Sequence, residues 1–182
     1  MLGLFAAFGL AAATGLNAYL PLLIVGLMAR YTGLIALKAP WSALTHPVVL
    51  VLLAVFLAIE FTVDKIPAVD SVNDVIQTIF RPAAGAILFA ASGNVISELS
   101  PVLAMVCGLL IAGSIHTAKA AARPVITAGT LGTGNPVVSL AEDAVSGTTT
   151  VVAIVAPALL AVLALLVLFW FLRRRRRRTM RR

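Results

Sequence analysis

The chain has few charges for its length. Only 12% of its 182 residues are charged, whereas soluble domains carry about a quarter. Hydrophobic residues make up 61% of the chain and the mean hydropathy is +1.06, which excludes an ordinary soluble domain. The single cysteine, Cys107, excludes a disulfide within one chain and leaves the redox compartment open. The composition therefore predicts an integral membrane protein.

The positive charge is concentrated at one end. The net charge of +7 comes from 14 basic and 7 acidic residues, and most of the basic ones lie within Arg173–Arg182. This tail follows the apolar segment Val151–Leu172, which is long enough for one crossing of a bilayer. Such a tail favours a cytoplasmic C-terminus against anionic lipid headgroups, rather than nucleic-acid binding. We expect one polytopic membrane domain over residues 1–172, followed by the tail.

The first apolar stretch, Leu2–Met28, is interrupted near its middle. Gly15, Asn17 and Pro21 weaken a helix there, so the stretch forms either one kinked helix or two half-helices that meet at Asn17. The next stretch, Pro47–Val63, is apolar except for Glu60 near its end and is typical of a membrane span.

Three later stretches are unusual. Pro82–Ile96 and Pro101–Ile115 are shorter than the roughly 20 residues that a crossing needs. Ser114–Thr150 is too polar to cross alone and too apolar for a free loop, so we expect a re-entrant segment. The predicted fold is an all-α integral membrane protein of about five to six transmembrane helices with broken or re-entrant segments.

A Gly-Asn pair recurs in these stretches, as Gly93-Asn94 and Gly134-Asn135, with a looser copy at Gly15–Asn17. Glycine loosens a helix and hydrocarbon cannot solvate the asparagine amide, so each copy needs polar partners. Arg81-Pro82 precedes the first full pair, and Arg123-Pro124 precedes the second at nearly the same distance. We interpret this shared frame as an internal duplication around a polar site at membrane depth.

Polar and ionisable side chains in apolar surroundings are candidates for a substrate or ion path. The asparagines either line such a path or join helices, and the arginines either reach the interface or bind buried glutamates or an anionic solute. Glu60 belongs to the same group of ionisable residues, whereas the two histidines are interpreted as interfacial or structural. The candidate path residues are Asn17, Arg81, Asn94, Glu98, Lys119, Arg123, Asn135, Ser139, Glu142 and Asp143.

A separate group of carboxylates is a candidate metal site. Asp70 and Asp74 are four residues apart, so on a helix they share a face, and Asp64 precedes them. Oxygen ligands of this kind could hold Mg²⁺ or Ca²⁺. The alternative is a solvated turn that nearby basic residues neutralise. No resident cofactor is otherwise expected, because the chain contains no recognisable catalytic signature.

Together these motifs resemble a bacterial membrane family known as domain of unknown function 4126. The resemblance implies a small polytopic inner-membrane protein and implies no activity, and the arginine tail is not part of its pattern. The segments that carry it are Thr14–Leu22, Asp64–Asp70, Asn73-Asp74, Arg81–Gly85, Ser92–Glu98, His116–Pro124 and Gly134–Asp143.

The function that the sequence favours is a small transporter or channel-like protein for a small polar or charged solute. We expect it in a bacterial plasma (inner) membrane with the C-terminus cytoplasmic. We also expect a homo-oligomer, since a chain of 182 residues offers little bundle to enclose a path. One alternative is a membrane enzyme that acts on a lipid or diphosphate headgroup with a divalent metal. Another is a non-catalytic membrane scaffold.

Overall fold

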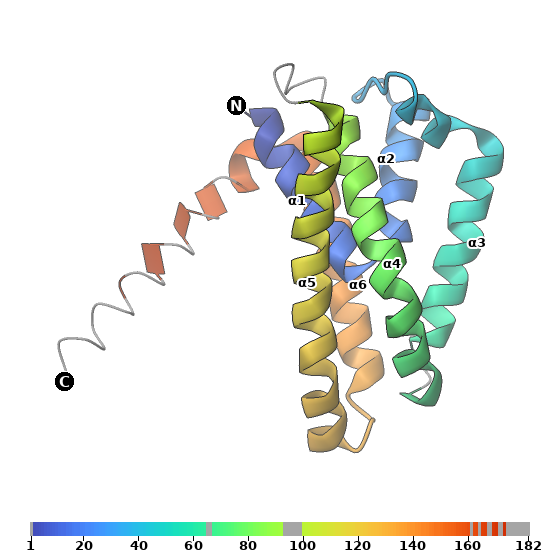
Figure 1. Ribbon diagram of the computed structural model, residues 1–182, viewed down its shortest axis with the longest axis vertical. Coiled ribbons are helices and arrows are strands. Elements are labelled where there is room, and N and C mark those ends of the chain that lie inside the picture. Colours follow the sequence, from blue (N-terminus) through green and yellow to red (C-terminus); the bar gives the residue numbers. More distant parts are fainter. Residues whose placement is uncertain are drawn as a thin grey trace.

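The computed structural model describes residues 2–64, 67–92 and 100–160, with a few positions beyond them, and only the backbone of residues 2 and 67–72 (Figure 1). Within these residues every regular element is a helix, which confirms the all-helical fold class. The elements are α1 (Leu2–Leu16), α2 (Tyr19–Tyr31), the short 3-10 helix η1 (Trp41–Thr45), α3 (Pro47–Val63), α4 (Pro67–Ala91), α5 (Pro101–Thr130) and α6 (Asn135–Val155).

Among the described residues, three helices are long and apolar enough to cross a membrane, which supports the membrane class. The stretches concerned are Asn73–Ala91, Pro101–Thr130 and Asn135–Val155. The helices α1, α2 and α3 are apolar but shorter. At 1.5 Å per residue, α1 is about 22 Å long and α2 about 20 Å, so neither crosses a hydrocarbon core of about 30 Å.

α1 enters the bundle from the end at which α4 finishes and α5 begins (Figure 1). Near its start, Ala7 and Ala11 pack against Phe89 of α4 and Ala104 of α5. At its end, Gly15 has reached only the middle of α5, where an added Cβ would lie 2.5 Å from Cβ of Ile115. α1 therefore stops half-way along the bundle.

α2 returns to the end from which α1 came. Its first residue, Tyr19, stacks on Phe56 in the middle of α3, with ring centroids 5.4 Å apart. About two turns later, Gly26 lies against the backbone of Leu44 in η1, the short helix that precedes α3. The two half-helices thus form a V whose apex, Asn17 and Ala18, lies inside the protein (Figure 1). The half-helix alternative for Leu2–Met28 is confirmed.

α3, α4, α5 and α6 run alternately up and down beside this V (Figure 1). α4 and α5 pack closely against each other, because Gly85 and Gly108 face each other at their crossing. An added Cβ on Gly108 would overlap the carbonyl oxygen of Gly85 and lie 2.6 Å from Cβ of Phe89. α5 and α6 are joined by a tight turn in which Leu131 and Gly132 have φ of 52° and 83°.

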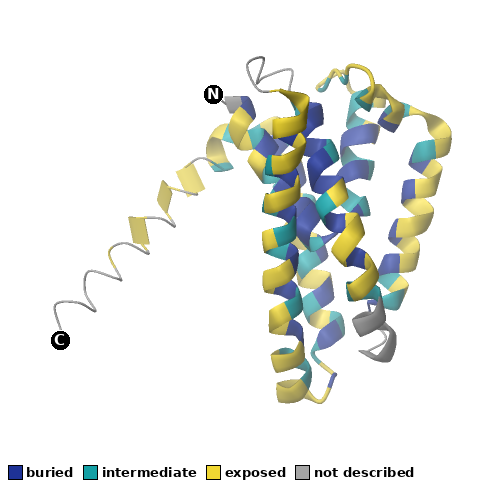
Figure 2. Cartoon of the chain, in the orientation of Figure 1, coloured by how far each residue is buried: buried dark blue, intermediate teal, exposed yellow. Residues whose placement is uncertain are grey.

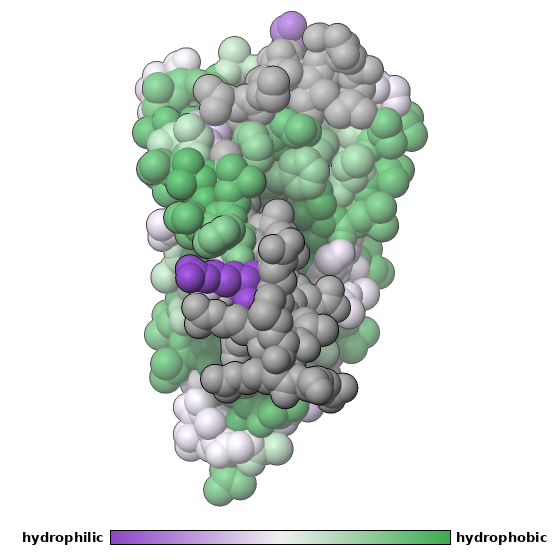
Figure 3. All heavy atoms as spheres, turned by 90° about the vertical axis from the view of Figure 1, so that its left-hand side faces the viewer, coloured by the Kyte–Doolittle hydropathy of each residue, from purple (hydrophilic) through white to green (hydrophobic). Residues whose placement is uncertain are grey.

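The outer faces of the helices are apolar. Figure 2 shows exposed residues along the outside of α3 and α5 and buried ones where the helices meet. Large apolar side chains such as Val51, Phe56, Leu110 and Val137 are 45–69% exposed. Figure 3 shows that hydrophobic residues cover most of the described surface on one side of the bundle. Lipid tails are the surroundings that such a surface fits.

Two predictions about the helices are wrong. Pro82 does not begin a segment but lies inside α4, as Pro124 lies inside α5. Ser114–Thr150 is not re-entrant, since it contains the second half of α5, the turn and most of α6. Long membrane helices tolerate an internal proline where neighbouring groups satisfy the freed carbonyl, and polar side chains where these are buried against other helices. The element that turns back inside the bundle is α1–α2 instead.

Candidate functional site

The break between α1 and α2 leaves backbone groups inside the bundle that neither helix satisfies. Asn17, which is fully buried, satisfies two of them, because its Oδ1 accepts hydrogen bonds from the N–H groups of Tyr19 (3.1 Å) and Leu20 (2.8 Å). Its amide nitrogen donates to Oδ1 of Asp143 on α6 at 2.9 Å. Asn17 therefore caps α2 and ties the break to α6.

Side chains from α5 and α6 donate hydrogen bonds to carbonyl groups at the end of α1. Nζ of Lys119 donates to the carbonyl oxygen of Leu16 at 3.2 Å, and Oγ of Ser146 donates to that of Ala13 at 2.9 Å. A cation is favourable at this position, because the C-terminal end of a helix carries partial negative charge. The long helices α5 and α6 thus hold the break between α1 and α2 in place.

Lys119 is also the centre of a group of ion pairs. Its Nζ lies 2.9 Å from Oε2 of Glu142 and 4.0 Å from Oδ2 of Asp64. Arg123, one turn further along α5, donates to the same Oε2 of Glu142 at 2.8 Å.

Asp64 also accepts hydrogen bonds from Asn73 of α4 (2.8 Å) and from Oγ of Ser139 on α6 (3.3 Å). The contacts link α3, α4, α5 and α6.

Arg81 is the centre of a second group. Its side chain is fully buried inside α4 and donates to Oε1 of Glu60 on α3 at 3.0 Å. The same guanidinium lies 3.5 Å from Oδ1 of Asp74 and 3.0 Å from Nδ1 of His116 on α5. Arginine can only donate, so Nδ1 of His116 accepts, and the imidazole is neutral with its proton on Nε2. That nitrogen contacts Oγ1 of Thr78 at 3.0 Å.

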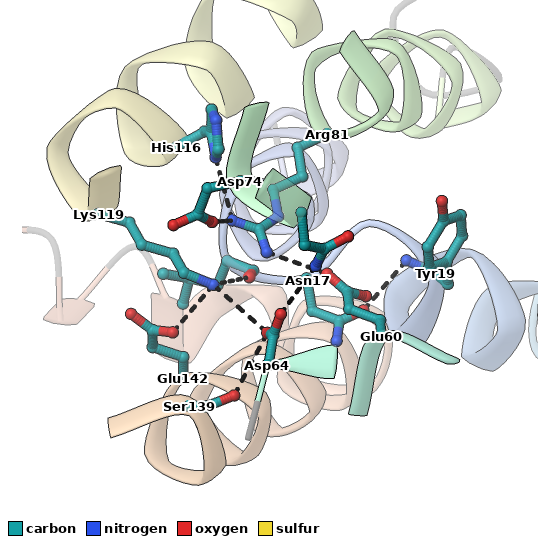
Figure 4. Close-up of polar contacts among 12 residues, drawn as sticks. Asn17, Tyr19, Glu60, Asp64, Asp74, Arg81, His116, Lys119, Ser139 and Glu142 are labelled. Atoms are coloured by element: carbon teal, nitrogen blue, oxygen red, sulfur yellow. Dashed lines mark hydrogen bonds and ion pairs between the residues drawn. The ribbon is translucent and has the colours of Figure 1, made fainter. Parts of the chain in front are cut away.

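These two groups and the helix break form one continuous cluster, which we call the polar centre. Figure 4 shows its labelled side chains converging from the α1–α2 junction, α3, α4, α5 and α6. Most members are buried, and only the side chains of Asp74 and Glu142 are 13% and 16% exposed. The members are Asn17, Glu60, Asp64, Asp74, Arg81, His116, Lys119, Arg123, Ser139, Glu142 and Asp143.

Buried polar atoms at the edge of the polar centre lack a hydrogen bond. Among the described residues, no partner lies within hydrogen-bond distance of Oε2 of Glu60, Oε1 of Gln77 or Nε of Arg81. Glu60 and Gln77 are each 2% exposed. Buried polar groups usually find partners, so these atoms mark a place that can take a proton, a water molecule or a small polar ligand.

A family comparison covers this whole site. The family described as Domain of unknown function (DUF4126) matches residues 4–177, a range that contains every member of the polar centre. The chain belongs to this family. Comparison with curated proteins and with solved structures found no match in either set. The resemblance in the sequence motifs is therefore confirmed, but the match extends to residue 177, so the expectation that the arginine tail lies outside the family pattern is wrong for its first residues. The site must be interpreted from its own geometry.

The polar centre brings together most of the candidate path residues, and it also contains Glu60. Their spacing on the long helices explains this, because His116, Lys119 and Arg123 share one face of α5, and Ser139 and Asp143 share one face of α6. Asn94 and Glu98 lie outside the described residues. The candidates in the cluster are Asn17, Arg81, Lys119, Arg123, Ser139, Glu142 and Asp143.

Asn135 lies apart from the other candidates. Its side chain exchanges hydrogen bonds with Oγ1 of Thr127 at 3.1 and 3.0 Å, beside the turn that joins α5 to α6. This pairing joins the two helices, which is the structural alternative for an asparagine in a membrane helix.

The candidate metal ligands face cations. Asp64 lies beside Lys119, and Asp74 lies beside Arg81. The side chain of Asp70 is outside the described part of the chain. Within that part, no three His, Cys, Asp or Glu residues are grouped as a metal ion requires.

The sequence interpretation missed His116, Tyr19 and Gln77. His116 is not isolated, because it precedes Lys119 by three residues on the buried face of α5. Gln77 lies near the Tyr19 hydroxyl group, which is also close to Glu60. The spacing of His116, Lys119 and Arg123 was the available signal. For Tyr19 no signal existed, because its position depends on the V shape of α1–α2.

Proposed function

We propose that the chain is a small membrane transport protein for a small polar or charged solute, and that the polar centre is its solute site. The observation that carries this proposal is the break at Asn17, which is buried, capped and joined to Asp143. Discontinuous helices that meet charged side chains at mid-depth are typical of the binding sites of secondary transporters. A purely structural bundle has no need for so many buried charges, which are costly in hydrocarbon.

Access from one end supports the proposal. The exposed parts of Asp74 and Glu142 belong to the half of the bundle that α1 and α2 do not fill. The V occupies the other half. The solute would therefore reach the polar centre from the end at which α5 and α6 are joined.

The space beside the V leaves room for a movement that would open the opposite end of the bundle, the end at which α1 begins. An apolar cavity of about 410 Å³ lies against both arms, with Leu10 of α1 and Val25 of α2 in its wall. Small side chains, Ser146 and Ala153 among them, form the buried face of α6. A rocking of the V into this cavity would alternate access to the polar centre, as the repeats of secondary transporters do.

The Arg-Pro units support an inverted duplication. Arg81-Pro82 lies in α4 and Arg123-Pro124 lies in α5, and these neighbouring helices are antiparallel (Figure 1). Two copies of one unit in opposite directions are the arrangement that many transporters use. We propose that the duplicated unit has this inverted orientation.

For the membrane topology, we propose four crossings by α3 to α6, with α1–α2 re-entrant. The arginine tail would then lie in the cytoplasm against anionic headgroups of the plasma membrane. Contacts between copies of the chain would use its apolar outer faces, which is the basis for proposing a homo-oligomer.

The test is solute uptake by proteoliposomes, followed by light scattering with glycerol, alanine, potassium chloride and potassium acetate as probes. We expect at least one probe to enter faster than into protein-free vesicles. Asp143→Asn should slow that uptake several-fold, because it removes a charge but keeps an oxygen for Asn17. Thr148→Val, on the exposed face of α6, is the matched control and should leave uptake unchanged. Uptake equal to that of empty vesicles for every probe, or unaffected by Asp143→Asn, would overturn the proposal.

A further inference from the structure

The polar centre contains more acids than bases. Arg81, Lys119 and Arg123 supply its positive charges, while His116 is neutral because it accepts a hydrogen bond from arginine. Full ionisation of the carboxyl groups would therefore leave two negative charges in a buried site without a counter-charge among the described members of the polar centre. Such charge is strongly unfavourable, which favours the binding of protons or cations at this site. The carboxyl groups are those of Glu60, Asp64, Asp74, Glu142 and Asp143.

Glu60 is the carboxyl group with room for a proton. Its Oε1 accepts from Arg81 at 3.0 Å, but its Oε2 has no hydrogen-bond partner among the described residues. By contrast, both oxygens of Asp64 accept hydrogen bonds, and one oxygen of Glu142 receives two cations.

A second unpartnered acceptor lies nearby on α4. Oε1 of Gln77 is buried and has no donor among the described residues, and the Gln77 side chain lies near the Tyr19 hydroxyl group. Tyr19 also lies within electrostatic range of Glu60. Two acceptor oxygens cannot hydrogen-bond to each other, but a proton on Oε2 of Glu60 would turn this oxygen into a donor.

We propose that Glu60 is a proton-binding site, and that transport through the polar centre is coupled to its protonation. The coupling rests on the proposed function, whereas proton binding does not. In the binding step a proton from water bonds to Oε2 and the carboxylate becomes a neutral acid. Arg81 then keeps Asp74 as its charged partner, and the excess of negative charge falls from two to one.

Several charged or titratable groups face Glu60 and set the conditions for this step. Cations favour the ionised form and carboxylates favour the protonated form. Proton binding is therefore a property of the cluster as well as of one residue. The groups are Tyr19 of α2, Asp64 after α3, Asp74 and Arg81 of α4, His116 and Lys119 of α5, and Asp143 of α6.

The test is an infrared pH titration of the full chain in lipid vesicles. We expect a carboxylic-acid band on acidification that Glu60→Gln removes and that Thr62→Val, an exposed change two residues away, preserves. Isotope-labelled glutamate keeps the test valid if Glu60→Gln fails to fold. The band should then shift in the native chain, whose glutamates are Glu60, Glu98 and Glu142. Glu142→Gln should leave the shifted band in place.

Three outcomes separate this inference from the proposed function. Probe uptake that is independent of pH, with no glutamate band, overturns the proton site and leaves the transport proposal standing. A band that requires Glu60, without uptake of any probe, supports the proton site and overturns the transport proposal. Spectra that respond to added sodium at fixed pH but not to acid would identify an alkali cation as the neutralising ligand, which contradicts the inference.

Discussion

At the residue scale, Asn17 explains why a helix can end inside a membrane protein. An amide carries both an acceptor and donors, so one side chain can cap α2 and also reach Asp143. Aspartate would cap equally well but would meet Asp143 as a like charge. Leucine would remove the acceptor of two backbone N–H groups and the donor to Oδ1 of Asp143, each at a cost of about 1–3 kcal/mol.

Exchanging the amide and the carboxylate between Asn17 and Asp143 tests that explanation. Asn17→Asp should destabilise the protein by about 3 kcal/mol or more, because it places two carboxylates together in a buried site. Adding Asp143→Asn should restore much of the loss, since the amide it introduces can donate to the carboxylate at position 17. The measurement is the free energy of unfolding in detergent micelles. If the double variant were as unstable as the sum of the single ones, the contact would not hold the break.

The sequence could identify the residues of the site better than their partners. Asn17, Arg81 and Lys119 were predictable, because a polar side chain in an apolar segment is unusual by itself. The contact of Lys119 with the carbonyl of Leu16 was not, since it joins residues more than a hundred positions apart. The sequence contains no local signal for such a pair.

At the element scale, the crossing of α4 and α5 fixes the positions of Arg81 and His116 relative to each other. The helices can approach closely there because Gly85 and Gly108 have no side chains. A methyl group on Gly108 would meet backbone atoms of α4, which cannot move without shifting the helix.

Gly108→Ala should therefore destabilise the protein by about 1–3 kcal/mol. Gly113→Ala is a matched control on the same helix, because its new methyl would lie 3.7 Å from Cγ of Pro82, an ordinary contact. This control should be neutral or stabilising by up to about 1 kcal/mol, since alanine favours a helix. Thermal unfolding in detergent distinguishes the two. Equal melting temperatures would contradict the packing described for α4 and α5.

The lengths of the elements were harder to predict than their class. Hydropathy alone indicated membrane helices, but it divided the chain at Pro82, Ser114 and Thr150, where polar or proline residues interrupt the apolar pattern. In the structure these residues lie within α4, α5 and α6, because the polar face of each helix is buried against other polar faces. Tertiary contacts, which a local pattern does not contain, decide this.

At the scale of the whole molecule, the bundle consists of two halves. The V of α1 and α2 fills one half, and the polar centre occupies the other half up to the apex at Asn17 (Figures 1 and 4). The transport proposal depends on this division, because a V that crossed the membrane would place its termini on opposite sides and would not end at the polar centre.

The most direct test of the central claim is the side of the membrane on which each end of the V lies. In a Cys107→Ala background, single cysteines would be placed ahead of Met1, at Lys38 after α2, and at Thr133 in the turn between α5 and α6. Labelling uses a membrane-impermeant maleimide on sealed vesicles. We predict that the first two cysteines react from one side and the third from the other. Reaction of the N-terminal cysteine and Lys38→Cys from opposite sides would contradict the re-entrant pair and the site built on it.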